Sequence, residues 1–61
     1  MPDYEARLFR ANDTLAVVAP IVASNDYDAK VSAVRYLTGE IAYIRLSRDG
    51  EEFATVRPRR E

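Results

Sequence analysis

Two turn-forming pairs, one near each end of the chain, constrain its fold more than any other feature of the sequence. Runs of strand-forming residues flank Asn12-Asp13 and Asp49-Gly50, and one helix-like stretch, Asp26 to Leu37, lies between them. Turns of this kind join neighbouring antiparallel strands. The sequence therefore predicts a single small α+β domain over residues 1–61, a four-stranded antiparallel sheet of ββαββ order with the helix packed on one face.

The first predicted hairpin has a register that its own apolar residues support. Apolar residues alternate with others along the first strand, which is the period of a strand with one buried face. If Asn12 and Asp13 form a two-residue loop, all the apolar partners point the same way. These pairs are Leu8 with Val17, Ala6 with Ala19 and Tyr4 with Ile21. Pro20 cannot donate a main-chain hydrogen bond, which predicts that the second strand lies at an edge or bends there.

The predicted helix has a marked start and a broad apolar side. The residues suited to N-capping are Ser24, Asn25 and Asp26. Asp26 and Asp28 add negative charge at the positive end of the helix dipole, and Gly39 is expected to supply a left-handed C-terminal residue. The apolar side predicted to face the sheet consists of Tyr27, Ala29, Val31, Ala33, Val34 and Leu37. Lys30 falls inside this arc, where its stem is expected to cover apolar surface while its ammonium group reaches water.

The second predicted hairpin has two open registers. Residues 42–47 alternate as a third strand, and residues 53–57 form a fourth after the Asp-Gly turn. A two-residue loop predicts the pairs Leu46–Phe53 and Tyr43–Val56. A three-residue loop with Gly50 in a bulge predicts the pairs Ile44–Ala54 and Ala42–Val56. The pattern of residues does not choose between the two.

The shortness of the chain predicts that it needs stabilisation from outside its own core. A domain of 61 residues buries only about 60% of the surface that its unfolded chain exposes. Disulfides, metal ions or self-association usually compensate, but the chain has no cysteine and no histidine. We therefore expect no disulfide, no metal and no other cofactor. Self-association remains, and a homodimer is the predicted state.

No segment of the chain predicts insertion into a membrane. The longest mostly apolar run, residues 15–23, contains Pro20 and is far shorter than the roughly 20 residues of a membrane helix. Residues 1–5 are acidic where a secretory signal is basic and then apolar, so a cytoplasmic location is expected. A net charge of −1 selects no class of partner. Residues 58–61 are predicted to be a short flexible tail.

One helix can cover only one face of a four-stranded sheet, so the other face is the candidate interaction surface. Alternation places on it Arg7, Phe9, Val18, Tyr43 and Arg45, with Glu5 and, depending on the register, Phe53 or Val56. Three interpretations stay open: a homodimer that uses this face or an edge strand, a solvated face without a partner, and a nucleic-acid- or toxin-binding surface. Aromatic and arginine side chains bind single-stranded RNA on some sheets, but acidic residues interleave with the basic ones here, which disfavours nucleic acid.

The sequence predicts no enzyme. Without histidine and cysteine the chain lacks the commonest general base, thiol nucleophiles and the usual zinc ligands. The paired carboxylates Asp26/Asp28 and Glu51/Glu52 have local explanations, as charge at a helix start and as the solvated flank of a turn. We therefore expect no catalytic, cofactor-binding or metal-binding residue, and a non-enzymatic interaction or regulatory module.

The whole chain resembles a group of short uncharacterised bacterial proteins that share this plan of strands and helix. The residues that carry the resemblance are Met1-Pro2-Asp3-Tyr4, Asp26-Tyr27-Asp28-Ala29 with Ala33 and Leu37, and the run from Ile44 to Gly50. The resemblance implies the fold and no activity, because such proteins have none established. A weaker likeness to antitoxins of the HicB type implies a toxin-binding regulator, although the chain lacks the separate DNA-binding segment of that group.

Overall fold

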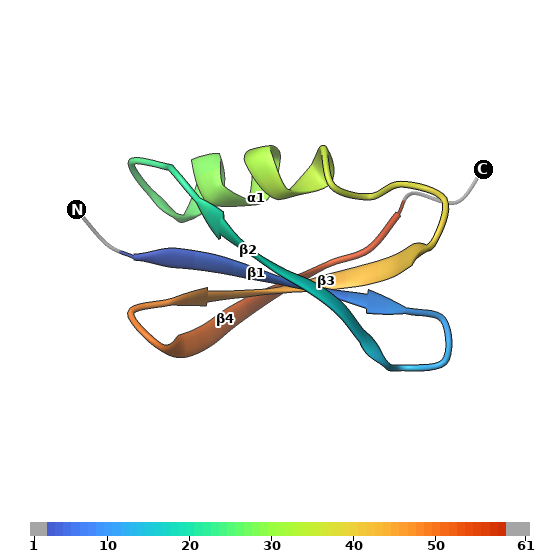
Figure 1. The fold of residues 1–61 in the computed structure, drawn as a ribbon. Coiled ribbons are helices and arrows are strands. Elements are labelled where there is room, and N and C mark those ends of the chain that lie inside the picture. Colours follow the sequence, from blue (N-terminus) through green and yellow to red (C-terminus); the bar gives the residue numbers. More distant parts are fainter. Residues whose placement is uncertain (1–2, 59–61) are drawn as a thin grey trace.

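The computed structural model describes residues 3–58 and shows the predicted α+β plan. Its elements are β1 (Tyr4–Arg10), β2 (Leu15–Ile21), α1 (Asp26–Val34), β3 (Ile41–Arg48) and β4 (Glu51–Val56). Figure 1 shows a twisted sheet with α1 lying over one of its faces. The fold class predicted from the sequence is confirmed. Residues 59–61 of the predicted tail lie outside the described part of the chain.

The four strands are antiparallel and lie in the order β2-β1-β3-β4. β1 and β3 are therefore the central pair, and each hairpin contributes one central strand and one edge strand. The position of β2 at an edge confirms the prediction made from Pro20. A proline has no N–H to donate, so it fits a strand where one side has no neighbour.

The first hairpin keeps its predicted register although its loop is one residue longer than predicted. The pairs Tyr4–Ile21, Ala6–Ala19 and Leu8–Val17 form as expected. The loop spans residues 11–13: the amide of Asp13 donates to the carbonyl of Arg10 at 2.9 Å, and Asp13 adopts a left-handed φ of 65°. A bulge at Ala16 takes up the extra residue. The two departures cancel, so the predicted pairing is right and the predicted loop is wrong.

The second hairpin follows neither of its two predicted registers. Its loop has two residues, Asp49 and Gly50, and both have positive φ, 51° and 87°. This primed turn matches the right-handed twist of the strands that it joins. A bulge at Phe53 then shifts the rest of the ladder by one residue. The resulting pairs are Arg48–Glu51, Ser47–Glu52, Leu46–Ala54, Arg45–Thr55 and Ile44–Val56.

Phe53 and Val56 both lie on the face that carries α1, which corrects the possible placement of one or the other on the opposite face. Phe53 packs against the core and meets the ring of Tyr4 edge-on, with the centroids 5.8 Å apart. Val56 lies opposite the buried Ile44. One extra residue inverts the alternation of every residue that follows it, so the bulge turns Val56 toward the core, whereas Phe53 takes this side by ordinary alternation from Glu52.

Gly50 is expected to be much harder to replace than Gly39. Gly50→Ala should lower the free energy of unfolding by about 1–2 kcal/mol, because an L-residue is strained in the left-handed region. This backbone strain is the only expected cost, because no atom lies within 4 Å of the added methyl group and no steric clash arises. Gly39 is equally open but has no positive φ, so Gly39→Ala is the matched control and should be neutral or slightly stabilising. Urea unfolding measures both, and equal losses would contradict the prediction.

α1 begins where the sequence predicts. Asn25 is the N-cap, and its side-chain oxygen accepts a hydrogen bond from the amide of Asp28 at 2.9 Å. Asp26 and Asp28 stand in the first turn, at the positive end of the helix dipole. Within residues 3–58, no helix has the length and apolar character needed to cross a membrane.

The end of α1 differs from the prediction. The helix stops at Val34, and the chain winds on more tightly, with the amide of Leu37 donating to the carbonyl of Val34 at 3.1 Å. The C-cap residue, Arg35, is right-handed, and Gly39 has no positive φ. The predicted glycine C-cap is therefore wrong. The tightened turn already bonds the last helical carbonyls, which leaves no need for a left-handed residue there.

Only a narrow side of α1 faces the sheet, so the predicted broad apolar side is wrong in part. Ala29 and Ala33, one turn apart, are fully buried, and Leu37 packs against the same core. The predicted sheet-facing residues that are exposed instead are Tyr27 (73%), Val31 (47%) and Val34 (53%). Because the two alanines are short, contact with the sheet is confined to their side of the helix, and residues further round point to solvent. Lys30 is exposed, as expected from its long stem.

The core between α1 and the sheet is small. Nine of the described residues form it, and four of them are alanines. The full set is Tyr4, Ala6, Leu8, Ile21, Ala23, Ala29, Ala33, Ile44 and Leu46. The largest fully buried side chains are Ile44 and Leu46, both on the central strand β3. Little apolar surface is therefore buried for a chain in which almost half of the residues are hydrophobic.

Candidate interaction surfaces

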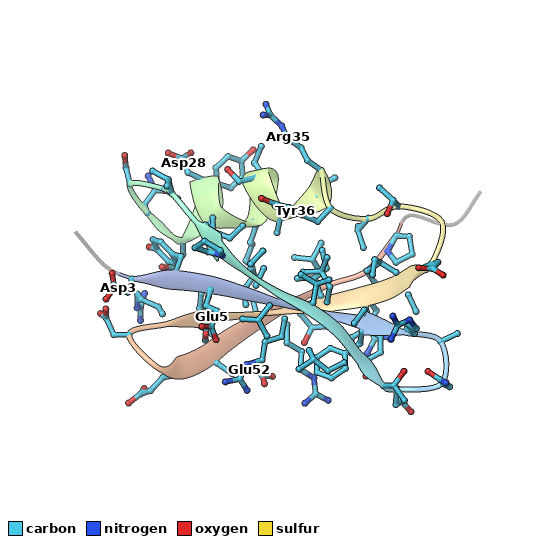
Figure 2. The ribbon with its side chains drawn as sticks, in the orientation of Figure 1. Asp3, Glu5, Asp28, Arg35, Tyr36 and Glu52 are labelled. Atoms are coloured by element: carbon cyan, nitrogen blue, oxygen red, sulfur yellow. The ribbon has the colours of Figure 1, made fainter. Side chains whose placement is uncertain are left out.

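The five predicted interaction residues lie together on the sheet face opposite α1, which we call the open face. Arg7 lies opposite Val18 on one side and opposite Arg45 on the other, and Phe9 lies opposite Tyr43. Residues that face each other across a ladder point to the same side of the sheet. Leu15, Glu5, Glu52 and Thr55 share this face by the same register. Figure 2 shows Glu52 on the side of the sheet away from α1.

Phe9 and Tyr43 form a stacked aromatic pair on the open face. Their ring centroids are 5.0 Å apart and their planes differ by 9°. The guanidinium of Arg45 lies 5.4 Å from the Phe9 centroid and 5.8 Å from the Tyr43 centroid, and that of Arg57 lies 5.3 Å from the Tyr43 centroid. Each such contact at an exposed site contributes about 0.5–1 kcal/mol. The two rings are thus occupied by each other and by arginines of the same chain.

The hydroxyl of Tyr43 fixes this aromatic pair to the first turn. It donates a hydrogen bond to Oδ1 of Asp13 at 2.8 Å. This hydrogen bond to a carboxylate, together with burial, raises the pKa of Tyr43. The open face at this end is therefore preorganised by contacts within the chain. The sequence predicted the shared face of Phe9 and Tyr43 but not their stacking.

The centre of the open face carries two arginines, each paired with a glutamate. Arg7 and Arg45 lie opposite each other on the two central strands. Arg7 pairs with Glu5 at 3.3 Å, and Arg45 pairs with Glu52 at 3.8 Å. All four side chains are about half exposed, and ion pairs at that exposure contribute little, at most about 1 kcal/mol. The two guanidiniums therefore keep most of their hydration.

The outer edge of β2 forms a second candidate surface, which we call the β2 edge. Its exposed apolar side chains are Leu15, Val17 and Val18. Val17 points to the side of α1, because it pairs with the buried Leu8, whereas Leu15 and Val18 point to the open face. No charged residue occurs from Thr14 to Asn25. Charged side chains oppose the pairing of an edge strand with another strand, so the β2 edge lacks this protection.

A polar cluster that the sequence analysis did not predict joins α1 to the sheet. The hydroxyl of Tyr4 donates to Oδ1 of Asp26 at 2.8 Å, and Nη1 of Arg48 lies 2.7 Å and 2.6 Å from the two carboxylate oxygens. Tyr4 begins β1, Asp26 begins α1 and Arg48 ends β3. Asp26 was predicted only as charge at a helix start. Both of its partners are 22 residues away in the sequence, so only the order of the strands brings the three together.

The contacts in this cluster have opposite effects on its two acids. Hydrogen bonds from Tyr4 and Arg48 lower the pKa of Asp26, and burial together with the bond to Asp26 raises the pKa of Tyr4. A carboxylate, a neutral phenol and a guanidinium are thus the stable combination at neutral pH. The carboxylate of Asp26 is bonded by both of the other groups. We assign the cluster a structural role: its hydrogen bonds link the helix to the two central strands.

The described part of the chain offers little for metal binding or catalysis. No group of three or more metal-ligating side chains occurs within residues 3–58. One open groove of about 480 Å³ lies between the end of α1 and the β2 side of the sheet. Apolar side chains, among them Leu8, Val17 and Ile41, line it together with the charged Arg10, Arg35 and Glu40. This open, mixed lining suits the surface of a protein partner more than a small substrate.

No protein-family model, no curated protein and no solved structure matches the chain. The resemblances to short bacterial proteins and to HicB-type antitoxins therefore stay predictions. The fold defines a class only, a small ββαββ domain with one covered sheet face. Function has to be inferred from the open face and the β2 edge.

Proposed function

We propose that this protein is a non-enzymatic interaction module of the cytoplasm that works as a homodimer. The observation that carries the proposal is the balance between buried and exposed apolar side chains. The small core contains four alanines, whereas eight large apolar side chains of the described residues are exposed. They are Leu15, Val17, Val18, Val22, Tyr27, Val31, Val34 and Tyr36. Covering part of this surface with a second copy adds the burial that a domain of this size lacks.

A binding role fits the titratable groups better than an enzymatic one. Asp26, the acid with the most altered surroundings, is held by Tyr4 and Arg48 and is not free to act on a substrate. Asp28 stands at the helix start, where its amide is bonded to the N-cap. Neither acid needs a catalytic explanation.

A nucleic-acid- or toxin-binding regulator is the competing role, and the geometry supports it less. Sheets that bind single-stranded RNA offer free aromatic faces to the bases. Phe9 and Tyr43 instead stack on each other and contact Arg45 and Arg57. A base would have to displace contacts that the chain already makes. Glu5 and Glu52 next to the arginines also oppose a phosphate backbone.

Sedimentation equilibrium over a range of protein concentrations tests the proposal. We expect the mass to rise from 6.9 kDa toward twice that value at tens of micromolar. The thermal midpoint should also rise with protein concentration, because dimer formation stabilises the folded state by mass action. A chain that stays monomeric and fully folded at tens of micromolar would contradict the proposed homodimer.

A further inference from the structure

We infer that the second copy docks on the β2 edge, with the two β2 strands antiparallel and the two sheets joined into one. This inference rests on the proposed homodimer and names the surface that forms it. It commits to one occupant, a second copy of this chain, and to one geometry, strand addition about a two-fold axis. The open face and the exposed side of α1 are the alternatives that it excludes.

The main chain of β2 supplies the first reason. An edge strand has N–H and C=O groups without partners on its outer side. Pro20 lies opposite Glu5 in the ladder, and a proline fits there only if its nitrogen points away from β1. Val18, two residues earlier on the same strand and paired without a bulge between, must then direct its own N–H and C=O outward. These groups are what a second strand needs for hydrogen bonding.

The side chains of β2 supply the second reason, because they suit a copy of themselves. Val17 is 52% exposed on the α1 side, and Val18 is 45% exposed on the open-face side. An antiparallel pair of β2 strands sets apolar residues against apolar residues on both faces of the joined sheet. No like charges meet, since the segment from Thr14 to Asn25 is uncharged. A self-complementary patch of this kind is what a two-fold dimer requires.

The distribution of charge excludes the two other ways of joining sheets. The opposite edge strand, β4, carries two adjacent charged side chains, Glu51 and Glu52, which oppose its pairing with another strand. A face-to-face dimer of the open face would enclose Arg7 and Arg45 together with their copies at its centre. Enclosing four guanidiniums is costly even with their glutamate partners, because the hydration that the charges lose can exceed what the ion pairs gain. The uncharged β2 edge has neither difficulty.

The groove next to β2 extends the proposed interface. It is lined in part by Val17 and Tyr36, and Figure 2 shows Tyr36 between α1 and β2. A two-fold axis perpendicular to the sheet keeps both α1 helices on the same face of the joined sheet. Val22, 89% exposed just after β2, also lies on this side of the molecule. A strand edge with these few flanking residues is a small interface, so we expect a dimer that dissociates on dilution.

Two features of β2 limit how many of its residues can pair with the second copy. The bulge at Ala16 raises the local twist of β2, and Pro20 removes a donor from its outer side. Residues 17–19 remain as the regular segment between them. We therefore place the centre of the pairing at Val18, opposite Val18 of the second copy, with Val17 beside it on the α1 side.

Three lysine variants test the inference by sedimentation, each checked for an unchanged fold by circular dichroism. Val17→Lys places a charge on the β2 edge but not on the open face, and we expect it to weaken dimerisation at least tenfold. Val31→Lys is the matched control, because Val31 is the same residue type with 47% exposure on α1, and it should leave the dimer intact. Thr55→Lys adds a charge to the open face and should also leave it intact.

Amide exchange gives a main-chain measurement that side-chain packing alone would not change. The amide of Val18 should exchange rapidly in dilute protein and more slowly, by tenfold or more, when the dimer is populated. Val17→Lys should restore rapid exchange at high concentration. If Val17→Lys unfolds the chain, Val17→Thr, which keeps a β-branched side chain, serves as the milder variant and should weaken the dimer with the fold intact.

The outcomes separate this inference from the proposed function. A wild-type chain that never dimerises contradicts both. A dimer that survives Val17→Lys but is broken by Thr55→Lys or by Val31→Lys keeps the proposed homodimer and overturns the β2 edge in favour of the open face or α1. A dimer in which the Val18 amide stays unprotected overturns the strand pairing.

Discussion

Leu46→Ala is expected to leave most of the protein unfolded at room temperature. Leu46 has no exposed surface and lies on β3, one of the two central strands. Replacing a fully buried leucine by alanine costs about 2–5 kcal/mol. The core of a domain this small supplies a net stability of only about 3–5 kcal/mol. The loss therefore matches the whole stability, and circular dichroism with urea titration at fixed protein concentration measures it.

Val31→Ala is the matched control for this experiment. Val31 lies on the exposed side of α1, so its truncation should change the stability by less than about 0.5 kcal/mol. A variant at Leu46 that unfolds with the wild-type midpoint would show that the core does not lie where the structure places it. Similar losses at both positions would show that the exposed side of α1 is buried in the folded protein.

Asp26→Asn is expected to make the protein less stable at neutral pH and to remove most of its sensitivity to acid. Hydrogen bonds from Tyr4 and Arg48 hold the pKa of Asp26 below the ordinary value of 3.8. A lowered pKa in the folded state adds stability that is present above the unfolded-state pKa. This stability is lost as the pH falls through the lower folded-state pKa. Urea midpoints of wild type and variant should therefore differ at neutral pH and converge as the pH falls below the lowered pKa of Asp26.

Asp28→Asn is the control that distinguishes the cluster from the helix dipole. Both acids stand in the first turn of α1, but only Asp26 bonds to the sheet through its side chain. If charge near the helix start is what matters, the two variants should lose the same amount of stability. If the hydrogen bonds of Asp26 to Tyr4 and Arg48 matter, Asp26→Asn alone should change the response to acid. Equal responses would remove the structural role assigned to the cluster.

The parts of the fold that the sequence predicted are those that depend on residues close together in the chain. Alternating apolar residues predicted the pairing of Tyr4 with Ile21, and Pro20 predicted an edge strand. The bulges at Ala16 and Phe53 have no such local signal, because their positions depend on packing against the opposite strand and α1. Strand alternation alone therefore left the face of Val56 undecided.

The helix shows why its apolar residues did not predict its buried side. A helical wheel ranks residues by direction, but the contact with the sheet is limited to the side of Ala29 and Ala33, the residues small enough to lie against it. Val31 and Val34 were left outside this contact. Their exposure adds to the apolar surface that β2 also leaves uncovered.

The sequence predicted part of the candidate surface. The five predicted residues share the open face, because alternation alone decides which side of a sheet a residue takes. The β2 edge was predicted through Pro20, although its apolar character on both faces needed the strand order. The cluster of Asp26 with Tyr4 and Arg48 lay beyond prediction, since it requires β1 and β3 to be neighbours.

The central position of β1 has a consequence for how the chain reaches its fold. β1 meets β2 through a short loop, but its ladder with β3, from Tyr4–Arg48 to Arg10–Ile41, joins segments separated by β2 and α1. Closing such a distant pairing costs chain entropy before any contact offsets it. The two hairpins form quickly on their own but are marginal in isolation. We expect the meeting of β1 and β3, with α1 coiled in the segment between them, to set the folding rate.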